Sequence, residues 1–110
     1  YVSTIESGKI KAWKKHYKMT CNFAVPIGEV KVVVYDDRVK SKTHGIINEF
    51  ILSPNSYSRL TISPNLWYGF SGLDEDLSYL INIANLSHEP DEKIDKKLEF
   101  IKYNKWLNKL

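Results

Sequence analysis

Short apolar segments recur along the chain about every ten residues, and turn residues separate them. The clearest is VKVVVYD at residues 30–36, which is rich in the β-branched residues that favour strands. PIGE at 26–29 and SPNS at 53–56 carry the proline, glycine and asparagine typical of turns. The segments predicted as strands are 2–5, 8–14, 20–25, 30–36, 46–52, 57–62, 67–70 and 77–85. A chain with this many short strands folds as a sandwich or barrel, so the sequence predicts an all-β fold.

The segment PDEKIDKKLEF at 90–100 is the only one with helical spacing. Ile94, Leu98 and Ile101 recur at intervals of four and three, and Pro90 stands where a helix could begin. We therefore predict a short tail of one or two helical turns that continues as irregular chain.

Composition limits the class of protein. The chain has 110 residues, of which 43% are hydrophobic, which fits one domain over residues 1–110. Sixteen basic residues are offset by thirteen acidic ones, so the net charge is only +3. A single cysteine, Cys21, cannot form a disulfide within the chain or a multi-cysteine zinc site, and it suits the cytoplasm. No apolar run reaches membrane-spanning length. Because the chain begins with Tyr1, we expect that an N-terminal segment is missing.

Lysines and a histidine are concentrated in GKIKAWKKH at residues 8–16. In a regular strand, Lys14 and His16 share one face with Ile10 and Ala12, and Lys11 lies on the other face. A neighbouring lysine favours the neutral imidazole, which is the form that can accept a proton. The lysines could equally protect an exposed strand from edge-to-edge aggregation.

Four stretches together resemble a known family. GKIKAWKKH, IGEVKVVVYDDRVKSKTHG, ILSPNSYSRLTISPNLWYGF and SYLINIANLSHEPDE follow, in order, the pattern of the dTDP-4-dehydrorhamnose 3,5-epimerases. The sequence is also similar to the sugar-nucleotide 3,4-ketoisomerases, whose first motif ends in His-x-His. The resemblance covers roughly residues 3–92 and implies a cupin, an antiparallel jelly roll also called a double-stranded β-helix.

The match is uneven at the positions that carry chemistry in the family. Lys11 stands where the family has a phosphate-contacting arginine, and Lys14 stands where it has the epimerase base. His16 matches the second histidine of the ketoisomerase motif. Tyr68 replaces a family histidine, and Asn82 falls at the position of the catalytic tyrosine.

The resemblance implies a nucleotide-sugar epimerase or isomerase that acts on a dTDP-4-keto-6-deoxyhexose for a surface polysaccharide such as lipopolysaccharide. In this interpretation the enzyme is a homodimer that needs no metal or other cofactor. Abstraction of a proton next to a ketone needs a base, an acid and a group that stabilises the enolate. We assign these roles to His16, Tyr68 and Lys14 in that order. The predicted substrate-binding residues are Lys11, Asn22, Asp36 and Asn82.

Two other functions fit the same residues. A cupin that binds a sugar nucleotide without turnover is suggested by the departures at residues 14, 68 and 82. A β-barrel that binds nucleic acid is suggested by the lysines and interleaved aromatic residues. The acidic stretches DEDL and EPDEK argue against the nucleic-acid interpretation.

Overall fold

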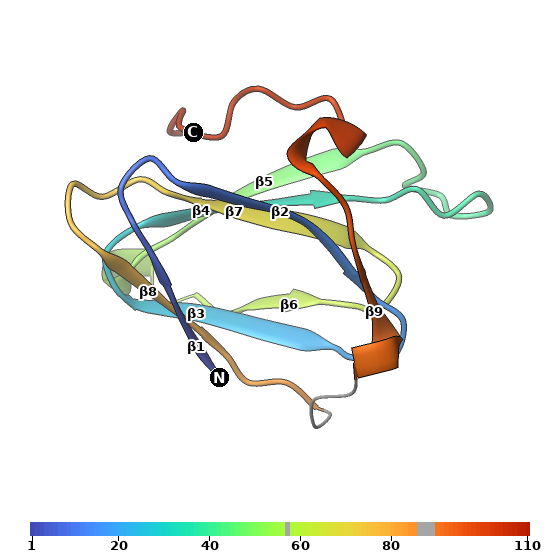
Figure 1. Cartoon of the computed structure of the whole chain (residues 1–110), viewed down its shortest axis with the longest axis horizontal. Helices are drawn as coiled ribbons and strands as arrows, with labels where there is room; N and C mark the ends of the chain where they lie inside the picture. The colour runs from blue at the N-terminus through green and yellow to red at the C-terminus, as the bar shows by residue number, and fades with distance from the viewer. Residues whose placement is uncertain (57, 86–89) are drawn as a thin grey trace.

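The structure is a computed structural model that describes residues 1–56, 58–85 and 90–110, and it confirms the all-β prediction. Two antiparallel sheets stack face to face (Figure 1). The small sheet has the order β1-β8-β3-β6 and the large sheet the order β5-β4-β7-β2-β9. The strands are β1 (Val2–Ile5), β2 (Ile10–His16), β3 (Cys21–Ile27), β4 (Val30–Tyr35), β5 (Ile47–Leu52), β6 (Leu60–Ile62), β7 (Trp67–Gly72), β8 (Ser78–Asn82) and β9 (Lys93–Asp95).

The chain passes from one sheet to the other at most of its connections, which gives the predicted jelly roll. Only β4 and β5 follow each other within one sheet. The tight β3–β4 turn depends on Gly28, which has a φ of +89°. A side chain at this position would also collide with Ser78, because an added Cβ would lie 2.2 Å from its Oγ.

Strand β4 is buried on both faces, which explains its nearly continuous run of valines. Val30, Val32 and Val34 point between the sheets into a core that includes Phe23. Val33 points the other way, into a second cluster on the outer face of the large sheet. Full burial of each such side chain contributes about 1.5–3 kcal/mol, so β4 anchors both layers.

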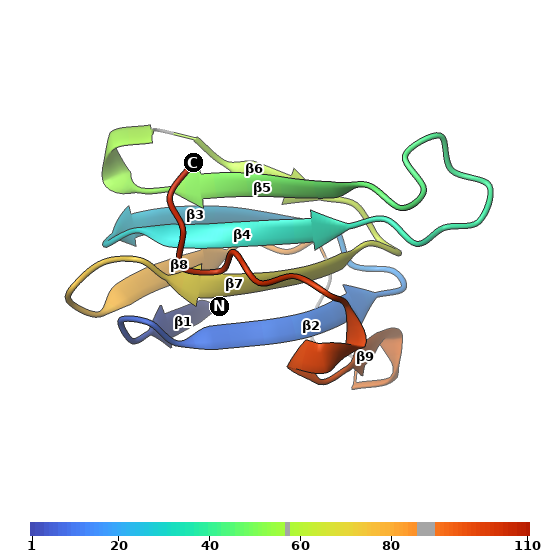
Figure 2. The same cartoon turned by 90° about the horizontal axis from the view of Figure 1, so that it is seen from above.

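The C-terminal tail covers that outer face. After β9 the chain turns back and runs over the large sheet to the C-terminus (Figures 1 and 2). Trp106 is buried and packs on Trp13, with 5.1 Å between ring centroids. The fully buried Lys31 of β4 donates from Nζ to the carbonyls of Lys105 and Asn108, and lies 2.8 Å from a Glu49 carboxylate oxygen. The tail is therefore an integral layer of the fold.

The prediction of one or two helical turns in the tail is only partly right, because a strand lies between the turns. Single 3-10 turns, η2 (Pro90–Glu92) and η3 (Leu98–Phe100), flank strand β9. Strand β9 forms because the edge of β2 offers unpaired backbone groups, and Lys14, Lys15 and His16 pair with Asp95, Ile94 and Lys93. A third 3-10 turn, η1, spans Pro54–Ser56. Within the described residues, no helix is long and apolar enough to cross a membrane.

Candidate active site

A β-bulge in β2 determines which side chains face the space between the sheets. Lys11 pairs with Phe70 and Lys14 pairs with Tyr68, so the one-residue register shift between them puts both lysines on the inner face. Ile10 and Ala12 pack against the outer cluster around Trp13. The predicted sharing of a face by Lys14 and His16 agrees with the structure. The placement of Ile10 and Ala12 with them, and of Lys11 opposite them, is wrong because of the bulge.

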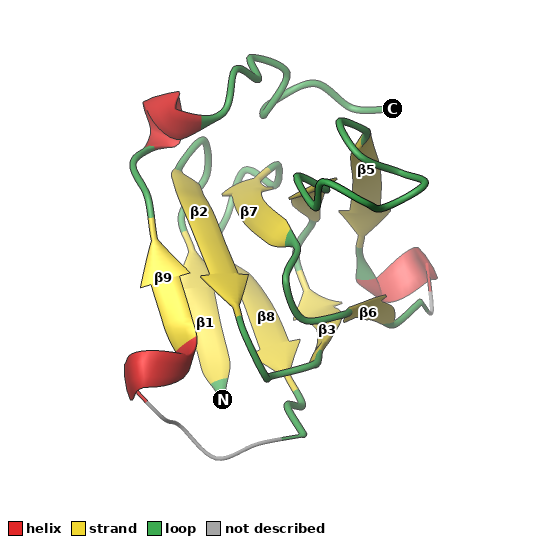
Figure 3. Cartoon of the chain, turned by 90° about the vertical axis from the view of Figure 1, so that its right-hand side faces the viewer, coloured by secondary structure: helices red, strands yellow, loops and turns green. Residues whose placement is uncertain are grey.

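A cavity of about 550 Å³ opens beside these residues, where β1 faces β2 and β9. Its volume lies within the roughly 300–1,000 Å³ typical of small-molecule sites. Figure 3 shows β9 running alongside β2 at this edge. The lining residues come from strands β1, β2, β7 and β9, from the residues that adjoin β1 and β9, and from the β2–β3 loop: Tyr1, Ser3, Lys11, Ala12, Trp13, Lys14, His16, Met19, Tyr68, Phe70, Lys93, Asp95 and Lys96.

His16 is held on both sides by hydrogen bonds. Its Nδ1 lies 2.5 Å from Glu92 Oε1, and its Nε2 lies 3.0 Å from the Tyr68 hydroxyl. An ionised carboxylate can only accept, so we assign the proton of the neutral imidazole to Nδ1. Nε2 is then an acceptor, and the Tyr68 hydroxyl donates to it. This carboxylate–imidazole–phenol chain reaches the cavity wall through His16 and Tyr68, and it is suited to moving a proton.

Glu92 is 3% exposed and is held as a carboxylate by its surroundings. Burial alone would raise the pKa of Glu92, but hydrogen bonds outweigh it and the pKa lies below its ordinary value. Besides His16, the backbone N–H groups of Lys18 and Met19 donate to Oε2, each at 3.1 Å. A carboxylate fixed in this way orients the imidazole and compensates its charge when it takes up a proton.

Tyr68 is 3% exposed, and burial strongly raises the pKa of its phenol. Its ring stacks beside His16, with 5.9 Å between centroids and an 18° angle between planes. Phe23 packs against it from the core in a T-shaped arrangement, with 5.2 Å between ring centroids. The nearby Cys21 thiol and Tyr1 phenol raise this pKa further. Tyr68 thus stays protonated and has a fixed position.

The rest of the cavity wall is strongly cationic. Lys11 donates to the carbonyl of Thr4 at 2.9 Å, and Asp95 lies 3.9 Å from the Lys14 ammonium and 3.3 Å from that of Lys93. With Lys96, the described lining residues supply four ammonium groups against one carboxylate. Such an excess of positive charge suits a phosphorylated ligand.

Three predicted substrate-binding residues lie outside this cavity lining. Asn82 is 2% exposed, and its Oδ1 accepts from the backbone N–H of Asn22 on the neighbouring strand. The Asn22 side chain donates to the carbonyl of Ile83 and accepts from Thr61, in exposed hydrogen bonds. Both asparagines therefore connect strands of the small sheet.

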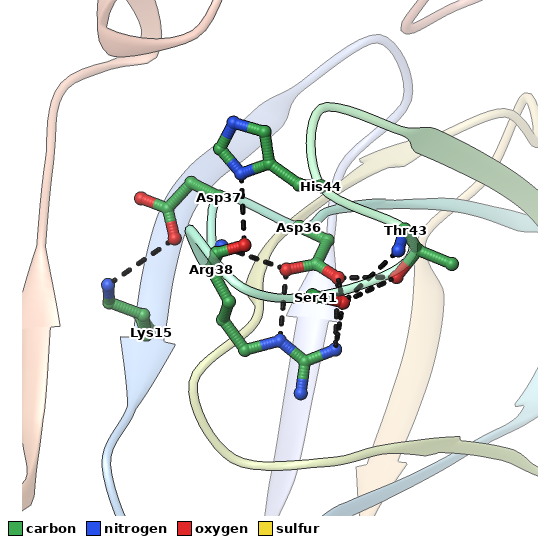
Figure 4. A network of polar contacts seen from close by, with 7 residues as sticks. All are labelled: Lys15, Asp36, Asp37, Arg38, Ser41, Thr43 and His44. Carbon is green, nitrogen blue, oxygen red and sulfur yellow. Dashed lines mark hydrogen bonds and ion pairs between the residues drawn. The ribbon is translucent and has the colours of Figure 1, made fainter.

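The Asp36 carboxylate makes its hydrogen bonds within the loop that follows β4 (Figure 4). Its carboxylate accepts two hydrogen bonds from the Arg38 guanidinium, each at 2.9 Å, and others from Ser41 and Thr43. The Arg38 hydrogen bonds, with those of Thr43 and Ser41, outweigh burial and hold the pKa of Asp36 far below its ordinary value. The Asp-x-Arg and Ser-x-Thr motifs thus shape this loop.

Glu92 is the functional candidate that sequence reasoning missed. It lies 76 residues from His16, and the pairing of β9 with β2 brings the two together. The available signal was indirect, since a buried histidine that works as a base usually has a carboxylate partner. Among residues 1–56, 58–85 and 90–110, no three His, Cys, Asp or Glu side chains gather in a way that could hold a metal ion.

Comparisons with known proteins relate the chain to enzymes of sugar nucleotides. No protein-family model matches it. It is 32% identical over 97 residues to the probable low-salt glycan biosynthesis epimerase Agl13 of Haloferax volcanii, covering 84% of this chain and 62% of that protein. It is 30% identical to the spore coat polysaccharide biosynthesis protein SpsL of Bacillus subtilis, covering 83% and 60%. The chain therefore spans about six-tenths of the length of these relatives.

Solved structures agree with the sequence comparisons. The crystal structure of a dTDP sugar isomerase from Desulfovibrio desulfuricans G20 is 34% identical and superposes with a TM-score of 0.91, over 99% of this chain and 71% of that one. The dTDP-4-dehydrorhamnose 3,5-epimerase of Bacillus anthracis, at 21% identity and a TM-score of 0.78 over 86% and 56% of the chains, shares the fold. The chain belongs to the family of the Desulfovibrio desulfuricans dTDP sugar isomerase and shares the fold of the dTDP-4-dehydrorhamnose 3,5-epimerases.

Proposed function

We propose that this chain is the catalytic jelly roll of an isomerase or epimerase that acts on a dTDP-4-keto-6-deoxyhexose. The observation that carries the proposal is the buried Glu92–His16–Tyr68 chain at the wall of a cationic cavity. The names of the relatives, which refer to glycan and spore coat polysaccharide biosynthesis, support a role in making a surface polysaccharide.

In this proposal His16 takes up the proton from the carbon next to the ketone. Glu92 holds the proton on Nδ1 and compensates the positive charge that the imidazole gains. Lys14 lies on the same face, next to Tyr68 across the β2–β7 pair, and its ammonium stabilises the negative charge that develops on the ketone oxygen. Return of the proton to the same or the neighbouring carbon completes an epimerisation or an isomerisation.

The lysines of the cavity bind the diphosphate of the substrate. Lys11, Lys93 and Lys96 line the cavity together with Lys14, and each supplies a point charge rather than the two-pronged contact of an arginine. Asp95 pairs with Lys14 and Lys93, and a phosphate group can take its place beside either ammonium.

The assembled form that we propose is a homodimer. The family resemblance supports it, as do two exposed apolar side chains at one side of the small sheet. Val2 on β1 is 59% exposed, and Ile83 just beyond β8 is 62% exposed. Apolar surface of this kind is suited to contact with a second copy.

The proposed function is tested by two measurements on the same protein. Calorimetry measures dTDP binding, and NMR follows the entry of solvent deuterium at the carbon next to the ketone of dTDP-4-keto-6-deoxyglucose. We expect binding and exchange in the unsubstituted protein. The His16→Ala variant should lose exchange by on the order of a hundred-fold or more and keep its dTDP affinity, because a base acts on the transition state.

Two results would contradict this function. Binding of dTDP without any exchange would identify a non-catalytic sugar-nucleotide-binding cupin. Full exchange by the His16→Ala variant would show that another group is the base.

A further inference from the structure

Neither ring nitrogen of His16 is left free for a substrate. Nδ1 is engaged by Glu92 at 2.5 Å and Nε2 by the Tyr68 hydroxyl at 3.0 Å. The lone pair with which the imidazole would take a proton from carbon is therefore occupied by a phenol. A direct transfer to His16 would require Tyr68 to leave its position.

The packing around Tyr68 opposes such a movement. The ring is 3% exposed, stacks beside His16, and makes a T-shaped contact with Phe23. Tyr68 is the second residue of the mostly buried strand β7, and protein interiors have little free volume. Yet Tyr68 lines the cavity, so a bound ligand can reach it.

We propose that the Tyr68 hydroxyl relays the substrate's proton to His16, an inference that rests on the proposed function. The carbon–hydrogen bond breaks as the phenolic oxygen takes the proton, and the phenol's own proton passes to His16 Nε2 in the same step. The electron pair left on carbon moves into the ketone, giving an enolate whose oxygen faces the Lys14 ammonium. The same transfers in reverse return a proton to carbon, so no other reactant is needed.

Two features of the site fit this relay. Burial raises the pKa of Tyr68, so a free phenolate does not form and the loss of the phenolic proton has to accompany the uptake of the substrate's proton. The Glu92 carboxylate, 2.5 Å from Nδ1, compensates the charge of the imidazolium that results. Across the β2–β7 pair, Lys14 lies directly opposite Tyr68, which puts the proton acceptor and the enolate stabiliser side by side.

The test is deuterium exchange into dTDP-4-keto-6-deoxyglucose by the Tyr68→Phe variant, with dTDP affinity measured in parallel. The relay predicts that exchange falls on the order of a hundred-fold or more while the affinity stays about the same. Tyr35→Phe is the matched control, because Tyr35 lies on the opposite face of the same sheet, and it should exchange like the unsubstituted protein.

The other outcomes separate the relay from the proposed function. Exchange by Tyr68→Phe within a few-fold of the unsubstituted rate would overturn the relay and leave His16 as the direct base. No exchange by the unsubstituted protein would overturn both. If Tyr68→Phe does not fold, proton loss from the substrate carbon is compared for the unsubstituted protein in H2O and in D2O. The relay predicts slower proton loss in D2O, because the exchangeable phenolic proton moves in the same step as the carbon–hydrogen bond breaks. Equal rates in the two solvents would overturn the relay.

Discussion

At the scale of single residues, two buried carboxylates show how similar groups take different roles. Glu92 faces the His16 imidazole at the cavity, where the carboxylate can compensate the positive charge that the imidazole gains with a proton. Asp36 faces Arg38, Ser41 and Thr43 within one loop, where its charge is permanently compensated (Figure 4). The Glu92 arrangement is suited to proton transfer at His16. The Asp36 arrangement holds the conformation of the β4–β5 connection.

The role of Asp36 predicts a pH-dependent effect on stability. Hydrogen bonds hold the pKa of Asp36 below its ordinary value of 3.8, so its contribution to folding is complete at neutral pH. As the pH falls below about 4, the unfolded chain binds a proton that the folded loop does not, and the contribution is lost. Asp36→Asn should therefore lower the unfolding midpoint at pH 7, and the difference from the unsubstituted protein should shrink below about pH 4.

Thermal unfolding followed by circular dichroism between pH 3 and 7 measures this difference. A constant gap between the two proteins over that range would contradict the assigned role of the Asp36 charge. Exchange activity of the folded variant should stay unchanged, because Asp36 does not line the cavity.

At the scale of elements, the sequence predicts regular strands better than their irregularities. The nearly continuous run of valines locates β4 to within a residue, and turn residues locate its neighbours. The bulge after Ala12 could not be predicted in this way, because it depends on how β2 pairs with β7. Strand β9 has only three residues and gains its backbone partners from β2, so local spacing suggested a helix in its place. Glu92 was missed for the same reason.

The tail predicts a contrast between two adjacent residues. Trp106 is 4% exposed and contacts Trp13 and Tyr103, whereas Leu107 is 52% exposed. Trp106→Ala should lower the free energy of unfolding by about 3–5 kcal/mol, because it opens a cavity in the outer cluster. Leu107→Ala should change it by no more than about 0.5 kcal/mol. Urea unfolding measures both, and equal effects would show that the tail does not pack as described.

At the scale of the whole molecule, the net charge is only +3, yet several lysines lie together at the cavity. Strands β2 and β9 are far apart in sequence, yet their lysines converge on one cavity with Asp95 as the single described carboxylate. A basic surface spread over the molecule would attract any polyanion, whereas a cluster inside a cavity favours a compact one such as a diphosphate. This charge layout supports the proposed nucleotide site over a nucleic-acid surface.

This difference predicts how position, rather than total charge, controls dTDP binding. Lys93→Ala removes a cavity ammonium and should weaken dTDP binding by about 1 kcal/mol, or roughly five-fold. Lys102→Ala removes the same charge beyond η3, away from the cavity, and should leave the affinity unchanged. Thymidine, which has no phosphate, should bind both variants equally.

Calorimetry at two salt concentrations measures these affinities. If Lys102→Ala weakens dTDP binding as much as Lys93→Ala does, or an oligothymidylate competes at equal phosphate concentration, the charge acts as a general polyanion surface and the diphosphate assignment of the cavity is wrong.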